Sequence, residues 1–317
     1  MAFGRCMLGR SAVGMGFVAL TVALGACGGG GGGGGSGSGS AGPAAPAVSY
    51  ATGTYGKAQA VYLPNLGSGS ATITDRSAAA GQTITYSATT PSSGNFSVGA
   101  MAGGTTMAGA TSGTLIPLSA TNTLYVSNDG TTIARVSTDA GANAPLTDAV
   151  YGRYWVYPAS GQEQVGGYFS GTPTSQAQMP GSITATYTGD FTGYRVMQAT
   201  GIASLAGSSS LTANFGAGTV NGSITNLINQ GNGLSQTYGL SMTGTITGNT
   251  YNGTVGFTPA GPAAAGTPVV TNSALNGAFY GNGATQTAGA LSISGQAPGA
   301  GGLTAPITVV GGFGARR

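Results

Sequence analysis

Few side chains in this sequence could carry out catalysis. The 317 residues include no His and two Cys, and Lys57 and Glu163 are the single Lys and the single Glu. The absence of His excludes a Ser-His-Asp triad, a Cys-His dyad and the usual zinc sites. A Gly-Lys-Ser/Thr phosphate-binding loop is excluded as well, because Ala58 follows Lys57. We therefore predict a protein that is not an enzyme and that holds no metal ion or cofactor.

The charged residues do not form a pattern typical of catalysis or of nucleic-acid binding. Five of the six carboxylates precede residue 164, and Asp190 is the one that follows. A glycosidase needs two carboxylates about 5–10 Å apart, and no spacing in the sequence indicates such a pair. We interpret Asp190, between Gly189 and Phe191, as a turn residue. The nine Lys and Arg residues are scattered along the chain, which predicts no nucleic-acid partner.

The N-terminus has the composition of an export signal that ends at a lipid-modified cysteine. Arg5 and Arg10 precede an apolar run over residues 12–24, which is too short for a membrane-spanning helix. The next residues have the order of a lipobox, in which small residues precede the thiol that diacylglycerol alkylates: Leu24, Gly25, Ala26 and Cys27. We predict a signal peptide over 1–26 and an acylated Cys27 that anchors the protein in lipid. An ordinary secretory signal with a chance Cys is the alternative.

Residues 27–47 are predicted to form a flexible tether behind the lipid. Gly fills residues 28–35 and alternates with Ser over 36–40, and such sequences behave as flexible coils. Gly28, rather than an Asp, follows the predicted lipid site, which favours the outer membrane of a Gram-negative cell. Cys6 would leave with the signal, and the thiol of Cys27 would be used by the lipid. We therefore expect the mature chain to have neither a disulfide nor a free thiol.

Residues 181–317 show the clearest pattern, a period of two over many short segments. In 182–188, Ile183, Ala185 and Tyr187 alternate with Ser and Thr. The same alternation predicts eight strands, at 182–188, 209–215, 218–226, 240–246, 251–257, 275–281, 291–293 and 307–313. One apolar and one Ser/Thr/Asn face per strand indicate an all-β fold, as an eight-stranded antiparallel β-barrel or a sandwich. A membrane-spanning barrel is a less favoured alternative, because these segments of roughly six to nine residues are shorter than the about nine to eleven that spanning needs.

Residues 48–180 alternate less regularly than the segment that follows them. Strand-like runs occur at 83–87, 123–126, 131–136, 151–156 and 164–169, between stretches of Gly, Ala, Ser and Thr. We predict a β-rich handle domain over 48–180 that precedes the barrel domain over 181–317. The boundary is placed at Met179-Pro180-Gly181, where Pro and Gly interrupt the chain.

The densest aromatic cluster lies in the predicted handle and is the candidate ligand-binding site: Tyr151, Arg153, Tyr154, Trp155 and Tyr157. Tyr, Trp and Arg supply most of the binding energy at many interfaces, which favours a binding platform. The alternative is a strand whose rings pack alternately into the protein. A Tyr could also ligate haem iron, but nothing in the sequence selects one of the 14 Tyr residues.

Residues 150–317 resemble the transferrin-binding-protein-B-like lipoproteins of Gram-negative bacteria. The resemblance lies in ordered blocks: Gly166-Gly167-Tyr168-Phe169, Gly171-Thr172-Pro173-Thr174, Ala185-Thr186-Tyr187-Thr188-Gly189, Asn214-Phe215-Gly216-Ala217-Gly218, Gly277-Ala278-Phe279-Tyr280-Gly281 and Gly312-Phe313-Gly314. The chain departs from the family at Gln286, where an acid is frequent. The resemblance implies one eight-stranded barrel, preceded by a handle and displayed on the outer membrane. It transfers no ligand-binding residue.

The resemblance also implies a non-enzymatic role, the capture of a host or environmental protein, haem or another iron carrier. An outer-membrane receptor or translocator is a further expected partner. A structural or adhesive surface lipoprotein without a discrete soluble ligand is the alternative. The composition supports this alternative, because only 5% of the residues are charged and few Arg or aromatic anchors are available for tight protein capture.

Overall fold

The computed structural model describes residues 112–156, 162–197, 201–260, 266–298 and 304–317, together with the backbone of four strands over 57–64, 74–75, 84–90 and 93–98. The predicted signal peptide, the tether with Cys27 and the candidate site residue Tyr157 lie outside the described residues. Within the described ranges, no helix has the length and hydrophobicity needed to cross a lipid bilayer.

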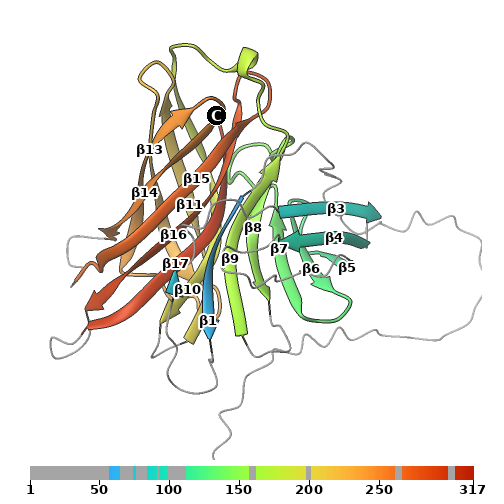
Figure 1. The fold of residues 1–317 in the computed structure, drawn as a ribbon, viewed down its shortest axis with the longest axis vertical. Helices are drawn as coiled ribbons and strands as arrows, with labels where there is room; N and C mark the ends of the chain where they lie inside the picture. The colour runs from blue at the N-terminus through green and yellow to red at the C-terminus, as the bar shows by residue number, and fades with distance from the viewer. Residues whose placement is uncertain are drawn as a thin grey trace, which may run out of the picture. The chain divides into compact units, whose positions relative to one another are not determined.

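The C-terminal half of the chain forms a closed antiparallel barrel (Figure 1). Its eight strands are β10 (Thr184–Met197), β11 (Gly201–Asn214), β12 (Thr219–Asn229), β13 (Tyr238–Thr247), β14 (Thr250–Pro259), β15 (Val269–Tyr280), β16 (Gln286–Pro298) and β17 (Thr304–Arg316). Each strand pairs with the next, and β17 closes the barrel by pairing with β10. Tight turns join several of them, as between β13 and β14, where Gly248 has a positive φ of 64°. The predicted eight-stranded antiparallel barrel is therefore confirmed.

The barrel strands are longer than the alternation in the sequence predicted. They contain 10 to 14 residues, where we expected six to nine. Strand β10 shows the reason, because exposed and buried residues alternate only over its first half, and almost every position from Phe191 to Val196 is buried. There the outward side chains of Thr192, Tyr194 and Val196 are covered by other parts of the protein. A strand that is buried on both faces loses the period-two signal.

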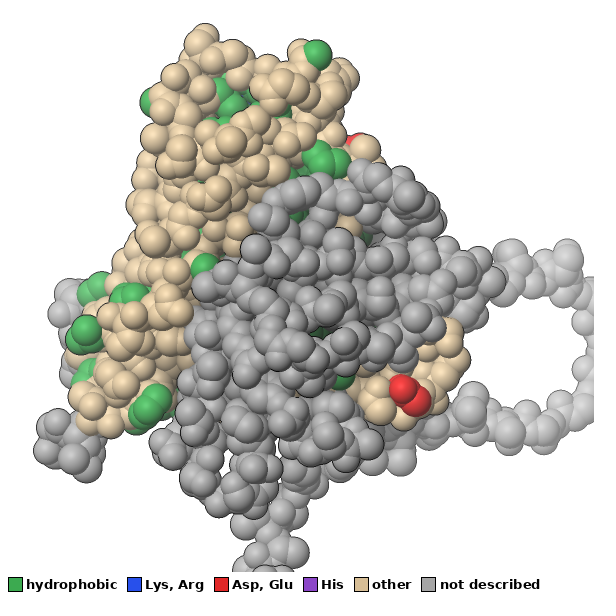
Figure 2. All heavy atoms as spheres, in the orientation of Figure 1, with side chains coloured by type: hydrophobic (Ala, Val, Ile, Leu, Met, Phe, Trp, Pro, Cys, Tyr) green, Lys and Arg blue, Asp and Glu red, His purple; other side chains and the backbone are tan. Residues whose placement is uncertain are grey.

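Strand length therefore no longer argues against a membrane-spanning barrel, but the distribution of side chains does. Spanning barrels carry an apolar band on the outside and polar groups inside. Here the interior holds Leu, Ile, Val, Met and aromatic side chains, whereas Thr184, Thr186 and Thr188 point outward and are exposed. Where Figure 2 colours described residues, their surface consists mostly of backbone and uncharged polar side chains, with scattered hydrophobic ones.

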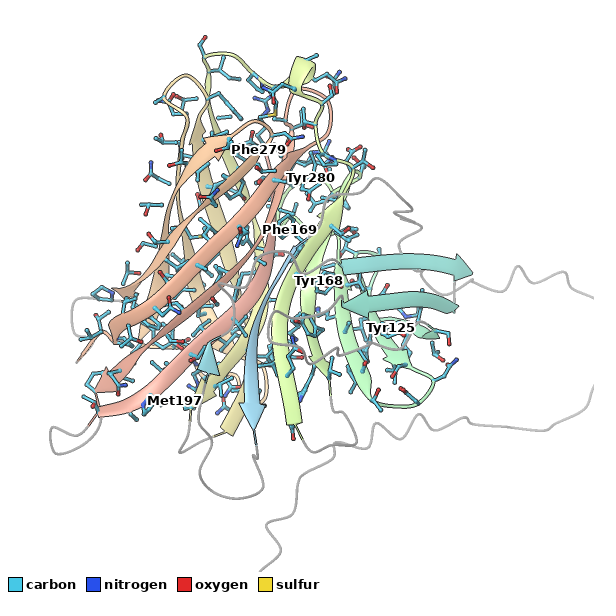
Figure 3. The ribbon with its side chains drawn as sticks, in the orientation of Figure 1. Tyr125, Tyr168, Phe169, Met197, Phe279 and Tyr280 are labelled. Carbon is cyan, nitrogen blue, oxygen red and sulfur yellow. The ribbon has the colours of Figure 1, made fainter. Side chains whose placement is uncertain are left out.

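Aromatic rings fill one end of the barrel. The ring of Phe279 lies 5.9 Å from Tyr187, 5.0 Å from Phe215 and 5.2 Å from Tyr251, measured between centroids. A side chain at Gly277 would overlap the ring of Tyr251, so this glycine provides the space for the ring. The Tyr187 hydroxyl donates a hydrogen bond of 2.6 Å to the carbonyl of Ala284 at the same end. Figure 3 labels Phe279 at this end and Met197 at the opposite end.

The preceding segment forms a nine-stranded antiparallel sheet in the order β2-β1-β9-β8-β7-β6-β5-β4-β3. Its strands are β1 (Lys57–Pro64), β2 (Thr74–Asp75), β3 (Ile84–Thr90), β4 (Ser93–Val98), β5 (Gly113–Pro117), β6 (Asn122–Ser127), β7 (Thr132–Ser137), β8 (Ala149–Val156) and β9 (Gln162–Gly171). A β-rich handle is confirmed. The sequence did not predict β1, β2, β4 or β5, which lie in or beside stretches rich in Gly, Ala, Ser and Thr that show no alternation.

Candidate functional site

The sheet and the barrel meet through glycines whose backbones lie in direct contact. Strands β8 and β9 lie against β16 and β17. A side chain at Gly167 on β9 would overlap the backbone of Gly311 on β17, and a Cβ at Gly312 would lie 2.5 Å from the carbonyl oxygens of both Gly152 and Tyr168. These glycines let the handle lie flat on the barrel wall, which brings the candidate site residues of β8 to this junction.

Tyr151 faces the barrel and is 1% exposed. It belongs to a buried cluster that includes Phe169 from β9 and Tyr280 from β15, both labelled in Figure 3. Its hydroxyl donates a hydrogen bond of 3.0 Å to the carbonyl of Asp139. Burial raises the pKa of Tyr151 far above its usual value, so it remains a neutral donor.

Arg153 lies two residues further along the same face of β8 and binds the barrel by several contacts. Its Nη1 donates to the carbonyls of Gly193 at 3.2 Å and Leu205 at 3.1 Å, and to Oε1 of Gln230 at 2.8 Å. The guanidinium carbon also lies 5.1 Å from the centroid of the Tyr194 ring, a cation–π distance. Burial lowers the pKa of Arg153, but an arginine remains charged in a protein at neutral pH.

Trp155 completes this face of β8. Its Nε1 donates a hydrogen bond of 3.0 Å to Oε2 of Glu163, and its ring packs edge-on against Tyr194 at 5.9 Å. Val165 on the neighbouring strand β9 is fully buried in the same contact with the barrel. Arg153 and Trp155 therefore hold Tyr194 of β10 between them, and their polar groups are used within the protein.

Tyr154 points to the opposite face of the sheet and is fully buried. Its hydroxyl accepts a hydrogen bond of 2.8 Å from Nε2 of Gln164, and its ring lies over Gly166, where a side chain would collide with it. The ring of Tyr168 lies beside it, 6.4 Å away between centroids. The structure thus separates the predicted cluster onto two faces of one strand. This placement corresponds to the packed-strand alternative, and a ligand role for these residues stays a prediction.

Gln286 of the barrel forms hydrogen bonds with the handle. In the sequence, this position stood out only because an acid is frequent there in the family. It is 1% exposed. Its Oε1 accepts hydrogen bonds from the backbone amides of Thr147 at 2.9 Å and Asp148 at 3.1 Å. Its Nε2 donates to Oγ1 of Thr147 and to Oδ2 of Asp148. An amide can both donate and accept, so Gln286 satisfies the amides and the carboxylate together.

The interpretation of Asp190 as a turn residue was wrong. Asp190 lies inside β10 and lines a small hollow of about 160 Å³ between sheet and barrel, together with Arg135, Asp139 and Tyr151. Burial raises the pKa of Asp190, and the nearby charge of Asp139 adds to the increase. Asp190 pairs with Gly314 of β17, so the ladder between β10 and β17 continues through this position. Gly314 has no side chain, which leaves room for Tyr151 of the handle. In the part of the chain that is described, no three His, Cys, Asp or Glu side chains gather as metal ligands would.

Residues 179–317 match the family model for the C-lobe and N-lobe beta barrels of Tf-binding protein B. The matched segment spans the whole of the closed barrel, from before β10 to the end of β17. The barrel therefore resembles the barrels of transferrin-binding protein B. The resemblance inferred from the sequence is therefore confirmed, and the matched residues are those of the barrel.

Solved structures resemble this chain at low sequence identity. A mutant Transferrin Binding Protein B from Haemophilus parasuis is 15% identical, with a TM-score of 0.44, over 82% of this chain and 44% of that one. Transferrin binding protein B from Neisseria meningitidis is 12% identical, with a TM-score of 0.30, over 83% and 76%. A protein described as a surface lipoprotein is 13% identical, with a TM-score of 0.36, over 82% and 98%. The chain thus spans less than half of the Haemophilus protein, and a search of curated proteins found no match.

Proposed function

We propose that this chain is a lipoprotein anchored in the outer membrane that binds a partner at the cell surface without enzymatic activity. The observation that supports this proposal most strongly is the barrel of the Tf-binding-protein-B type over 179–317. The predicted lipobox at Cys27 and the Gly/Ser tether behind it support the anchor. The partner is a host or environmental protein, haem or another iron carrier, and an outer-membrane receptor or translocator assists it.

The contact between handle and barrel supports a scaffold role for the barrel. A binding surface that is held rigidly loses less entropy when its partner binds. Arg153, Gln286 and the glycine contact at Gly167 fix the handle to the barrel wall through the backbone and through buried polar groups. We propose that these residues position the binding surface, and that the partner contacts parts of the handle that face away from the barrel.

The turn between β5 and β6 is the part of the handle that we assign to partner contact. Leu118 in this turn is 53% exposed, and Ile116 near the end of β5 is 43% exposed. Hydrogen bonds hold the turn in shape, because Oγ of Ser119 accepts from the Thr121 amide at 3.2 Å and Oδ2 of Asp139 accepts from Asn122 at 3.3 Å. Neighbouring exposed apolar side chains can form the centre of a protein contact, and we propose that Ile116 and Leu118 do so here.

The experiment that tests this function measures capture by cells that display the full chain. Cells producing the wild-type chain are incubated with host transferrin, with haem or with serum, and the bound material is compared with that on cells lacking the chain. We expect one of these to be retained, and retention to fall in a variant with Ile116→Ser and Leu118→Ser. The matched control is Thr186→Ser on the exposed barrel wall. Failure to retain any of them would favour the structural or adhesive alternative, which the weakly charged surface supports.

A second experiment tests the anchor separately from the ligand. Labelled palmitate is expected to enter the wild-type chain and a Cys6→Ala variant, since Cys6 lies in the predicted signal. A Cys27→Ala variant is expected to take up no label. Equal labelling of the Cys27→Ala variant would contradict the lipid site.

A further inference from the structure

One end of the barrel contains a cavity of about 320 Å³, which we call the barrel-end cavity. Its walls come from β10, from the segment between β12 and β13, and from β16 and β17; the lining used below is Arg195, Met197, Leu234, Gln236, Tyr238 and Ile307. This end carries Met197 in Figure 3 and lies opposite the end that the rings around Phe279 fill. Its volume falls in the range of small-molecule sites, which begins at about 300 Å³.

The pairing of the strands changes toward this end of the barrel. The ladder between β12 and β13 runs from Thr219↔Thr245 to Ile224↔Leu240 and does not reach the ends of the two strands. In the described residues, the ladder between β14 and β15 covers Thr250–Gly253 of β14, although this strand continues to Pro259. Beyond the β12–β13 ladder, the Gln236 amide donates to the Leu227 carbonyl at 2.7 Å and the Asn229 amide donates to the Leu234 carbonyl at 2.9 Å. The segment before β13 therefore stays paired with β12 and forms part of the cavity wall.

The cavity contains a cation without a carboxylate partner. Arg195 shares its face of β10 with Tyr187 and Phe191, the face that points into the barrel. Its Nη1 donates to Oε1 of Gln236 at 2.7 Å, while its buried Nε has no hydrogen-bond partner among the described residues. The sequence contains no Asp or Glu after residue 190, and Asp190 lies on the opposite face of the strand. The cation is therefore not neutralised by a carboxylate of the barrel interior.

Tyr238 is the second polar group of the cavity. Its side chain is 5% exposed, and its hydroxyl has no hydrogen-bond partner among the described residues. Its ring packs edge-on against Phe257 at 5.2 Å, which fixes the position of the hydroxyl. Arg195 and Tyr238 line the same cavity. Burial raises the pKa of Tyr238, and the charge of Arg195 opposes that increase. A buried hydroxyl left without a partner costs stability that a ligand could restore.

The rest of the lining is mixed, with polar groups such as Asn229 and Asn232 beside several apolar side chains. Met197 and Ile307 come from β10 and β17, and Leu234 stands at the rim with 64% of its surface exposed. Pro268 and Pro298 add further apolar surface. An unpaired arginine and a hydroxyl beside these apolar side chains match an amphiphile with an anionic head.

We propose that the barrel-end cavity binds a small monocarboxylate with a short apolar tail, whose carboxylate accepts hydrogen bonds from Arg195 and Tyr238. The planar guanidinium offers N–H groups in a geometry that matches a carboxylate. The tail lies against Met197, Leu234 and Ile307. This site is separate from the partner surface proposed for the handle, and either can fail without the other.

The test uses the complete mature chain from residue 27, with Cys27→Ala so that no acyl group of the protein competes. Isothermal titration calorimetry measures the binding of hexanoate, of hexanamide as its uncharged analogue, and of inorganic phosphate. We expect hexanoate to bind at least about tenfold more tightly than either of the others, because a full charge is paired in the cavity. No detectable binding of hexanoate, equal binding of hexanamide, or tighter binding of phosphate would each overturn the proposal.

Three variants locate the site on the protein. Arg195→Gln is expected to weaken hexanoate binding at least about tenfold, and Tyr238→Phe, which keeps the ring, about threefold or more. Arg317→Gln is the matched control, because Arg317 is exposed at the other end of the barrel, where it donates to the carbonyl of Gly283. It should bind hexanoate as the parent does. Unchanged binding in both Arg195→Gln and Tyr238→Phe would overturn the assignment, and circular dichroism checks that each variant is folded.

Discussion

At the scale of single residues, Arg153 shows how a charged side chain can serve the fold rather than a ligand. It donates to two backbone carbonyls and one amide oxygen of the barrel, and it lies over the ring of Tyr194. A buried carbonyl that loses its hydrogen-bond donor lowers the stability of the folded protein, because no water replaces that donor. The sequence showed an arginine among aromatic residues, a composition shared by interfaces within and between proteins, so it could not distinguish the two.

Replacing Arg153 by Leu should destabilise the protein. The change leaves the carbonyls of Gly193 and Leu205 without their donor, and we expect the free energy of unfolding to fall by about 1–3 kcal/mol. Urea denaturation followed by circular dichroism measures this value. The control Arg317→Leu, at an exposed position, should change it by less than about 0.5 kcal/mol. Equal stability of the two variants would contradict the conclusion that Arg153 holds the handle on the barrel.

Two aspartates should give pH dependences of opposite sign. The pKa of Asp190 is raised by burial, so the folded state disfavours its charged form; this penalty is complete above the folded pKa and disappears as the pH falls below 3.8. Asp190→Asn should therefore raise the melting temperature at pH 7, and the gain should vanish near pH 3. Thermal melts at both pH values measure this difference.

Asp129 provides the opposite case. Hydrogen bonds from Ser127 and Thr131 lower its pKa, so its contribution to stability is present above 3.8 and is lost as the pH falls through the folded pKa. Asp129→Asn should thus lower the melting temperature at pH 7 and have no effect at low pH. A change of the same sign in both variants at pH 7 would refute the assigned environments.

At the scale of secondary-structure elements, the sequence predicted what depends on local alternation and missed what depends on packing between elements. The eight barrel strands followed from one apolar and one polar face. Their full lengths did not, because the second half of β10 is covered on its outer face by the handle. The packing of Tyr151 against the barrel needs Gly314 on β17, and the close approach of Gly152 needs Gly312, both more than 150 residues later in the sequence. No local pattern connects such distant positions.

The contact between handle and barrel should therefore be sensitive to a single side chain on β17. Gly312→Val introduces a Cβ 2.5 Å from two backbone oxygens that cannot move aside, those of Gly152 and Tyr168. We expect a loss of about 1–3 kcal/mol or more in the free energy of unfolding, together with faster proteolysis of the handle. Urea denaturation and limited proteolysis measure the two effects.

Gly181→Val is the matched control for that variant. No atom lies within 4 Å of a Cβ at Gly181, so the change should leave stability and proteolysis nearly unaltered. If Gly312→Val behaved like this control, the close packing of the two sheets would not exist in solution.

At the scale of the whole molecule, the parts of the chain have different proposed tasks. The barrel of the Tf-binding-protein-B type is the proposed scaffold, the handle held against it presents the proposed partner surface, and the N-terminal segment provides the proposed lipid anchor. The weakly charged exterior places few strong ion pairs on the surface. Partner binding should accordingly depend little on salt, since screening weakens interactions between exposed charges.

The central claim is that acylated Cys27 holds this folded unit on the outside of the cell. The measurement that tests it most directly is protease treatment of intact cells that produce the full chain, followed by immunoblotting for the barrel. We predict that the chain is cut while the outer membrane is intact, and that a periplasmic control protein in the same cells stays whole. A chain that resists the protease until the outer membrane is permeabilised would contradict the account.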